Sequence, residues 1–417
     1  MAQRPRSRLL TVALGVLTAL WSAAAWGADA PARPDPDAAH ARALVLDSHA
    51  DIPLDFGKGA HDAGVDGDTQ VDLPNLKQGG VGAVVLAVFA PQGPRTPEGI
   101  AKARAVADAK LAAIRGVAAS HPDQAELALS AADVVRIHAA GKVAVIAGFL
   151  NAYPFGASLA PIDDYYAAGV RTFGFVHAGG NDYADSSRPA AGRGAEWGGL
   201  SPLGRQAVGK LNRLGVVIDV SQLTPEGVLQ TVALSKAPVI ASHSAVRGRV
   251  DSPRNLGDAE LDAIARSGGV VQIVAFGPYL VNPGPGYADK VRVVRARFGL
   301  SADFAKPADG ADALGDERRT AYAHEIAALL PKASVKDLVD AVDYAVRRIG
   351  VDHVGLASDF NHGGGVVGWS NEGEAANVTR ELVRRGYSEA DVGKIWGGNF
   401  LRVFAEVEAV AKRQGGA

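Results

Sequence analysis

Short runs of apolar residues alternate along the chain with longer stretches of amphipathic pattern. Each run is short enough to be a strand that is buried on both faces, as in a parallel sheet. The eight clearest runs lie at residues 43–47, 83–89, 143–149, 172–176, 216–220, 239–241, 270–275 and 354–357. Between them, apolar residues recur at helical spacing, most clearly in residues 97–120, 202–214 and 258–265. The pattern therefore predicts strands and helices in alternation.

Eight strand–helix units in one chain favour a (β/α)8 TIM barrel, an α/β fold. The alternative is a doubly wound sheet, which would need a glycine-rich phosphate-binding turn after a strand, and the sequence offers only Gly179-Gly180. Residues 277–346 are too long for one connection and contain Pro/Gly-rich stretches and at least two helical patterns. We therefore predict a helical insertion between the seventh and eighth barrel strands.

The first thirty residues have a different character. Three arginines precede an apolar run from Leu9 to Trp26, and the segment ends in Ala28-Asp29-Ala30. This order of basic, apolar and small residues is typical of a secretory signal peptide, and an uncleaved anchor is the alternative. No other stretch is long and apolar enough to cross a bilayer. We predict a signal peptide at 1–30, one barrel domain at 31–417, and export, most simply to a periplasm.

Charge and cysteine content narrow the function. The chain has 43 Lys+Arg and 45 Asp+Glu, a net charge of −2, which argues against a nucleic-acid partner. It has no cysteine, so any metal ion must be held by histidine, carboxylate or backbone oxygen.

Polar residues gather where the predicted strands end, and a barrel carries its chemistry at those ends. His49 and Asp51 follow the first strand, His177 the fourth, His243 the sixth and Asp359 the last. Because His49 and Asp51 are two residues apart on an extended strand, they share a face and can bind one cation, and imidazole with carboxylate suits Zn²⁺. Each residue alone fits a structural role such as a helix N-cap equally well. The prediction of a site depends on their coincidence at one end.

The other histidines have no such placement, and we assign them to surface or loop positions. Two of them, His61 and His362, follow residues of the predicted site and therefore fit the surface assignment less well.

Several longer motifs, in this order along the chain, resemble the renal (membrane) dipeptidase family of metal-dependent dipeptidases with an amidohydrolase-like barrel. The resemblance extends from about Val45 to Phe404, and its motifs together are highly specific. They are LDSHADIP (46–53), HAGGNDYADSSRP (177–189), GLSPLGRQAVGKLNRLGVVIDVS (199–221), SKAPVIASHS (235–244), PRNL (253–256), DHVGLASDF (352–360) and IWGGNFLRVF (395–404).

The resemblance implies a metal centre at the strand ends. In the family, the residues that match His49 and Asp51 bind one zinc ion, and the residue that matches His243 binds a second. Two ligand positions depart from the family pattern. Leu150 stands where a glutamate bridges the two ions, and Gln222 stands where a histidine binds. Two close cations repel each other unless an anionic ligand lies between them, so we expect one Zn²⁺ ion, with two as the alternative.

The resemblance also implies the substrate contacts. His177 contacts the substrate and stabilises the tetrahedral intermediate, with Asn181 of the same motif as a further substrate-binding residue. Arg254 binds the substrate carboxylate, and Asp359 is the catalytic acid and base. Because family members often dimerise, a homodimer is also expected.

These observations predict a zinc-dependent dipeptidase that hydrolyses the amide bond of dipeptides or small N-acyl amino acids. The alternative is a non-catalytic barrel, or one with altered chemistry, that binds a small carboxylate ligand through Arg254 and His177. The retained site residues favour the enzyme. The departures at Leu150 and Gln222 are the argument for the alternative.

Overall fold

The computed structural model describes most of the chain after residue 32, and residues 34–417 form one compact unit. The predicted signal peptide lies outside the described residues except for Met1. None of the described helices combines the length and the apolar character that crossing a bilayer requires. The described residues are 1, 33–53, 55–58, 61–67, 69–189, 194–303, 307, 311, 314, 315, 318, 321, 322, 325, 326 and 328–415.

Eight parallel strands form a single curved sheet in chain order, and each of the eight predicted runs coincides with one of them. A short strand that the pattern did not predict, β3 (Ala125–Leu127), pairs beside β4. The eight are β1 (Val45–Ala50), β2 (Val81–Phe89), β4 (Val143–Leu150), β5 (Val170–Gly174), β6 (Val217–Asp219), β7 (Ile240–Ser244), β8 (Val270–Val274) and β9 (Val354–Ala357).

The first and last strands meet and close the sheet into a barrel. The backbone N–H of Asp359 donates to the carbonyl of His49 at 2.9 Å, and that of Asp51 donates to Phe360 at 2.9 Å. The Asp47 carboxylate lies between the two strands and accepts the N–H of Ser358 at 2.9 Å and its hydroxyl at 2.5 Å. The predicted (β/α)8 TIM barrel is therefore confirmed.

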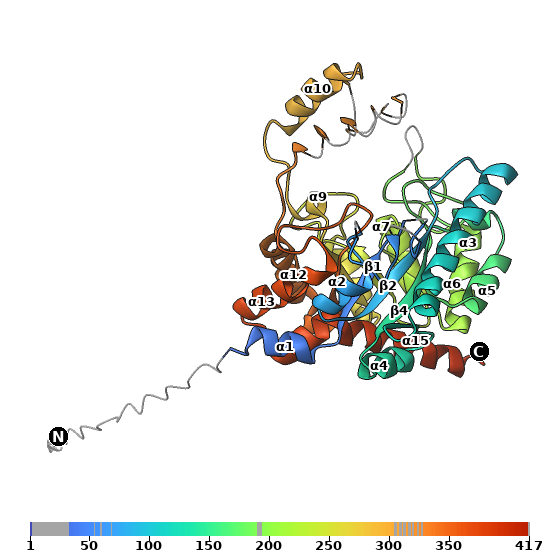
Figure 1. The fold of residues 1–417 in the computed structure, drawn as a ribbon. Helices are drawn as coiled ribbons and strands as arrows, with labels where there is room; N and C mark the ends of the chain where they lie inside the picture. The colour runs from blue at the N-terminus through green and yellow to red at the C-terminus, as the bar shows by residue number, and fades with distance from the viewer. Residues whose placement is uncertain are drawn as a thin grey trace. The chain divides into compact units, whose positions relative to one another are not determined.

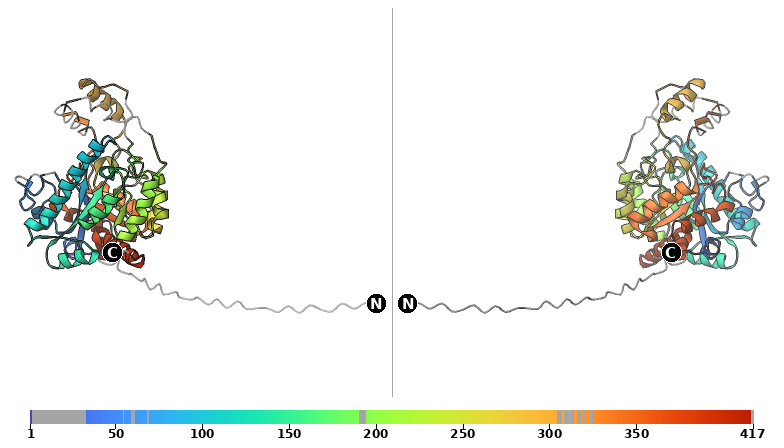
Figure 2. Two further views of the ribbon diagram at one scale, coloured as in Figure 1. Left: turned by 90° about the vertical axis from the view of Figure 1, so that its right-hand side faces the viewer. Right: turned by 90° about the vertical axis from the view of Figure 1, so that its left-hand side faces the viewer.

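Helices surround the strands on the outside, as the three ribbon views show (Figure 1, Figure 2). Three of them begin with a Ser or Thr N-cap followed by proline, a sequence that fixes a helix start: the Thr96, Ser201 and Thr224 hydroxyls each accept an N–H of the first turn. The surrounding helices are α3 (Pro97–Ser120), α4 (Ala131–Ala139), α5 (Ala160–Ala167), α6 (Pro202–Leu214), α7 (Pro225–Leu234), α8 (Asp258–Arg266), α12 (Val335–Ile349) and α13 (Ala376–Arg384).

Shorter elements connect these parts of the barrel. A π-helical turn, Lys394–Gly398, leads into the last helix, α15 (Asn399–Arg413). Fully described 3-10 turns lie at Tyr153–Phe155, Val351–His353 and Glu372–Glu374. The short helices are α1 (Pro36–Arg42), α2 (Leu73–Gln78), α9 (Gly277–Leu280), α10 (Tyr287–Arg297) and α14 (Glu389–Gly393).

The predicted insertion between the last two barrel strands is present but shorter than expected. It holds α9 and α10, whereas α12 packs on α8 and on strands β8 and β9 and is a helix of the barrel itself. The sequence interpretation extended the insertion to residue 346 because a helix of the insertion and a helix of the barrel share the same amphipathic period.

Side chains alternate between two cores along each strand. On β2, Val84, Leu86 and Val88 belong to the core between strands and helices, while Val85 points into the barrel. At the amino ends of the strands, the interior residues pack on Phe400 and Phe404 of α15, so this helix closes one end of the barrel. The functional residues are left at the opposite end, where the strands finish.

A buried carboxyl group lies behind the closing strands. Glu372 is fully buried, and its backbone N–H donates to the carbonyl of Gln70 at 3.0 Å. Burial, together with the charge of nearby Asp47, raises the pKa of Glu372 well above its usual range. The folded protein therefore holds the Glu372 proton to a higher pH than the unfolded chain does.

This proton makes stability depend on pH. Unfolded Glu372 ionises near its ordinary pKa of 4.5, so its retained proton opposes folding increasingly as the pH rises above that value. Glu372→Gln keeps a neutral side chain at every pH. We expect the melting temperature of the variant, relative to that of the wild type, to be higher at pH 8 than at pH 5. A difference that does not change with pH would mean that Glu372 is ionised in the folded protein.

Candidate functional site

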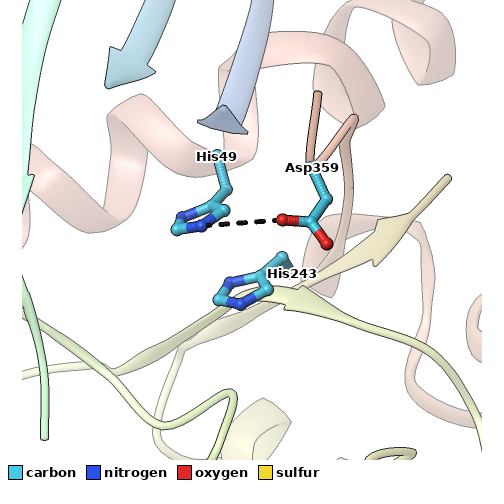
Figure 3. Close-up of side chains that lie close together, drawn as sticks. All are labelled: His49, His243 and Asp359. Carbon is cyan, nitrogen blue, oxygen red and sulfur yellow. Dashed lines mark ion pairs between the residues drawn. The ribbon is translucent and has the colours of Figure 1, made fainter. Parts of the chain in front are cut away.

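Three of the predicted residues converge at the carboxyl end of the barrel (Figure 3). His49 is the penultimate residue of β1, His243 lies on β7, and Asp359 lies in the turn after β9. Their ligand atoms are all within 4.8 Å of one another, and all three residues are buried. The two imidazole rings stack with centroids 3.8 Å apart, and Nε2 of His49 lies 3.9 Å from Oδ1 of Asp359.

The backbone beside these residues adopts an unusual conformation. Within the described residues, the non-glycine positions with positive φ are Asn151 (76°), Asp359 (56°) and Asn361 (59°), and all three follow barrel strands. Asp and Asn tolerate this left-handed region better than other L-residues, and such conformations concentrate at functional sites. The backbone bond from Asp359 to His49 keeps the two side chains side by side.

Burial sets the protonation of the cluster. It lowers the pKa of His49 to about 4 and the pKa of His243 well below its usual range, so both rings are neutral near pH 7. Burial raises the pKa of Asp359 to about 7. Neutral imidazole is the form that ligates metal ions, and a carboxyl group that titrates near 7 can both accept and donate a proton.

A directed chain of hydrogen bonds fixes the orientation of His243. Arginine can only donate, so Nη2 of Arg188 makes Oε1 of Gln222 the acceptor at 2.8 Å. The amide nitrogen of Gln222 then donates to Nε2 of His243 at 3.0 Å. The proton of His243 is therefore on Nδ1, which donates to Ser242 Oγ at 2.7 Å, and Ser242 donates to Asp219 at 2.6 Å. Nε2 is left as the nitrogen that carries the lone pair.

His177 lies at the same end of the barrel as predicted. Its Nε2 lies 3.1 Å from Nη2 of Arg188, so this nitrogen is an acceptor and the proton is on Nδ1. Its ring packs on Phe89 with centroids 4.5 Å apart. Burial is the largest cause that lowers the pKa of His177, so the ring is neutral. Sequence reasoning missed Arg188 as a site residue, although it lies within the motif at 177–189.

Asp51 lies outside the cluster of His49, His243 and Asp359. Its Oδ1 accepts from Nζ of Lys110 at 2.5 Å and from the backbone of Ile52 at 2.7 Å, and its Oδ2 pairs with Nδ1 of His362 at 3.0 Å. His362, which the sequence interpretation placed among surface and loop residues, thus contacts the site and is 32 % exposed. Lys110 comes from α3, and no sequence motif indicated it.

Arg254 is buried beneath the cluster with part of its guanidinium unpaired. Nη1 donates to the carbonyl of Ser221 at 2.5 Å and to Ser244 Oγ at 3.2 Å, and Nη2 donates to the carbonyl of His243 at 2.7 Å. Its Nε is buried and has no hydrogen-bond partner. An unpaired buried donor is costly, which suggests that a ligand atom completes it.

Asn181 has a structural role in this structure. Its amide nitrogen donates to Asn151 at 3.0 Å and to the carbonyl of Phe175 at 2.8 Å. Its Oδ1 accepts the N–H of Tyr183 at 2.9 Å and that of Ala184 at 3.3 Å. With these bonds Asn181 shapes the loop after β5, and its role in substrate binding stays a prediction.

The donor set fits one divalent ion and does not fit two. His49, His243 and Asp359 supply two neutral nitrogens and a carboxylate, the number of protein ligands usual in a catalytic zinc site. An ion at His243 would replace the hydrogen bond from Gln222. At the position of the missing bridging ligand, Leu150 is buried with Ala87 and Phe89 and offers no donor atom.

Known proteins are similar to this chain in sequence and in fold. The family model described as membrane dipeptidase (peptidase family M19) matches residues 36–416. The crystal structure of the probable dipeptidase PvdM from Pseudomonas aeruginosa is 43 % identical, with a TM-score of 0.83 over 90 % of this chain and 98 % of that one. Dipeptidase tcpJ of Claviceps purpurea is 30 % identical over 354 residues, 83 % of this chain and 71 % of that protein.

A more distant structure shares the fold. It is a metallopeptidase from Rhodobacter sphaeroides, solved with a phosphinate mimic of the dipeptide L-Ala-D-Ala. It is 21 % identical, with a TM-score of 0.68 over 88 % of this chain and 99 % of that one.

The hydrogen-bond chain predicts the effect of one hydroxyl on metal binding. Ser242→Ala removes the hydroxyl that accepts the hydrogen bond from His243 Nδ1–H. Without this bond, neither the orientation of the His243 ring nor the position of its proton is fixed. Loss of such an outer partner typically weakens metal binding about 10- to 100-fold, and we expect a loss in this range. Competition with a chelator, using Zn²⁺ or Co²⁺, measures it, and an unchanged melting temperature serves as the folding control. Wild-type metal affinity in the variant would show that these hydrogen bonds do not orient His243 as a metal ligand.

Proposed function

The chain belongs to the membrane dipeptidase family, and from this premise we propose that it hydrolyses dipeptides or small N-acyl amino acids with one bound zinc ion. The observation that carries the proposal is the convergence of His49, His243 and Asp359 from three separate segments within 4.8 Å. Two neutral imidazoles and a carboxylate are a suitable donor set for Zn²⁺. When bound, the ion supplies a Lewis acid for the scissile carbonyl and an acidified water.

Asp359 is the proton carrier in this proposal. Its buried carboxylate lies within the cluster, where it can take a proton from the attacking water and return it to the leaving amine. Asp359 would help to hold the ion through one carboxylate oxygen, and its second oxygen would remain to accept the proton. The backbone bond between Asp359 and His49 keeps the carboxylate in this position through the reaction.

His177 stabilises the oxyanion. The contact from Arg188 to its Nε2 leaves the proton on Nδ1, so the ring is a neutral hydrogen-bond donor. Burial lowers the pKa of His177, so the ring does not take up a second proton near pH 7. A fixed donor in a dry site stabilises developing negative charge more than water does.

Arg254 binds the substrate carboxylate. Its Nη1 and Nη2 groups are held by backbone and hydroxyl oxygens, which fix the plane of the guanidinium. Nε has no hydrogen-bond partner and is covered by neighbouring atoms, so a small movement of the side chain would let it donate to a carboxylate oxygen. A carboxylate also offsets the charge of a guanidinium that is only 2 % exposed.

A second candidate function is binding without hydrolysis. Leu150 and Gln222 remove two ligands of the family pattern, and the Gln222 amide already hydrogen-bonds to the free nitrogen of His243. A barrel of this kind would still bind a small carboxylate through Arg254. Metal-dependent turnover separates the two functions.

Export of the protein and a homodimer remain proposals. The segment that suggests export, residues 1–30, lies outside the described residues except for Met1. The motifs that suggest a homodimer are those of the family resemblance.

The substrate assignment predicts discrimination at the C-terminus of a dipeptide. The zinc-loaded wild type should hydrolyse dipeptides with kcat/KM about 10- to 100-fold above that of their C-terminal amides, because a charge-assisted hydrogen bond contributes about 1.5–3 kcal/mol. A chelator should abolish the activity and added Zn²⁺ should restore it. Equal rates on acids and amides would show that Arg254 reads no carboxylate. Binding of dipeptides with no turnover at any metal loading would support the second function.

The mechanism also predicts the effect of Asp359→Asn. This variant keeps the shape of the side chain and removes the basic oxygen, so kcat at saturating zinc should fall by at least about 10²-fold. The melting temperature should change little. Asp352→Asn, at an exposed position in the 3-10 turn before β9, is the matched control and should keep normal kcat. Near-normal kcat in Asp359→Asn would refute the proposed proton transfer.

A further inference from the structure

Lys110 is a buried cation in a helix whose other buried positions are apolar or alanine. The buried face of α3 consists of Ala103, Ala107, Leu111, Ile114 and Val117, with Lys110 among them. The Lys110 side chain is 9 % exposed, and its Nζ lies 5.5 Å from the centroid of the Phe89 ring. Lysine is almost never buried without a partner, so its position implies a specific one.

That partner is Asp51, and the contact occupies the carboxylate. Nζ of Lys110 lies 2.5 Å from Oδ1 of Asp51, which also accepts the N–H of Ile52, and His362 binds Oδ2. Both oxygens of Asp51 therefore already have donors. A metal ion at Asp51 would have to displace an ammonium group from a buried ion pair.

The anion that a second ion would need is absent from the same place. Phe89 and Leu150 are paired in the register of β2 and β4, and both side chains pack with Ala87 inside the barrel. Nζ of Lys110 lies 5.5 Å from the ring of Phe89, the strand neighbour of Leu150, so a glutamate at position 150 would bring a second carboxylate into this part of the barrel. Leucine brings none, so the carboxylate that contacts the Lys110 ammonium is that of Asp51.

Two arrangements of this site have the same net charge: a divalent ion with two carboxylates, and an ammonium group with one carboxylate. A divalent ion needs two carboxylates for neutrality, and an ammonium needs one. Buried charges must be compensated, because unpaired charge in the interior is costly. Replacement of a bridging glutamate by Leu150 and of a metal ion by Lys110 are therefore compensating changes, and each alone would leave a net charge.

We propose that the ammonium of Lys110 occupies the place of a second metal ion beside Asp51. Asp51 is then a partner of a fixed cation and of His362, and it is not a metal ligand. The inference builds on the proposed function only in that the remaining cluster of His49, His243 and Asp359 holds the other ion.

Counting bound ions in three variants tests the proposal. Metal-free protein is equilibrated with excess Zn²⁺, desalted, and analysed for zinc per chain. Leu150→Glu alone should bind the same number of ions as the wild type, because the ammonium remains. Lys110→Met alone should also match the wild type, because no bridging carboxylate is present. The double variant Lys110→Met/Leu150→Glu should bind one ion more. Lys102→Met, at an exposed position of the same helix, is the matched control and should have no effect.

The outcomes separate this proposal from the proposed function. A gain of one ion in Leu150→Glu alone, or no gain in a folded double variant, would overturn the role of Lys110. A wild type that binds no zinc would overturn the proposed single-ion centre. The role of Lys110 would still be decided by whether the double variant binds one ion more than the wild type.

A second measurement covers a double variant that does not fold. Asp51→Asn should weaken zinc binding to the wild-type site by no more than about 10-fold, as expected for a residue outside the ligand set, whereas His49→Ala should weaken it by more than about 100-fold. Equal losses in the two variants would make Asp51 a ligand and overturn the proposal.

Discussion

The hydrogen bonds between β1 and β9 are the constraint on which the site depends. They join residues near the two ends of the barrel sequence, His49 to Asp359 and Asp51 to Phe360, and the Asp47 carboxylate reinforces them through Ser358. Because His49 and Asp359 are bonded through their backbones, their side chains are neighbours whether or not a ligand is present. His243, from the other side of the barrel, completes the cluster.

Buried positive charge is the second feature that organises this end of the barrel. Lys110 and Arg254 are both more than nine-tenths buried, and Arg188 contacts both His177 and Gln222. The nearby imidazoles of His49, His177 and His243 are all neutral. Positive groups fixed by hydrogen bonds around neutral donors favour ligands that carry a carboxylate, which agrees with a dipeptidase substrate.

The sequence predicted the strands well because burial on both faces leaves continuous apolar runs. It also placed His49, His243 and Asp359 at one end of the barrel, because the carboxyl ends of parallel strands must meet, but it grouped Asp51 with the metal ligands, where the structure has Asp359 in the cluster. It could not predict the pairing of Asp51 with Lys110, since that contact joins a strand end to a helix 59 residues later and has no periodicity. The motif predicted that Asn181 binds substrate, and in the structure its side chain forms hydrogen bonds with the backbone of Phe175 and Tyr183. Motifs identify a neighbourhood, while side-chain orientation follows from packing.

The closure of the opposite barrel end by α15 has a consequence for how such a site can diverge. Phe400 and Phe404 pack on interior residues contributed by several strands, at the end where no chemistry occurs. Stability and catalysis are thus placed at separate ends of one barrel, as is usual for this fold. Residues such as Leu150 and Gln222 can therefore be exchanged at the functional end while the scaffold continues to fold. A lineage built in this way can acquire a new specificity by point replacements, one strand end at a time.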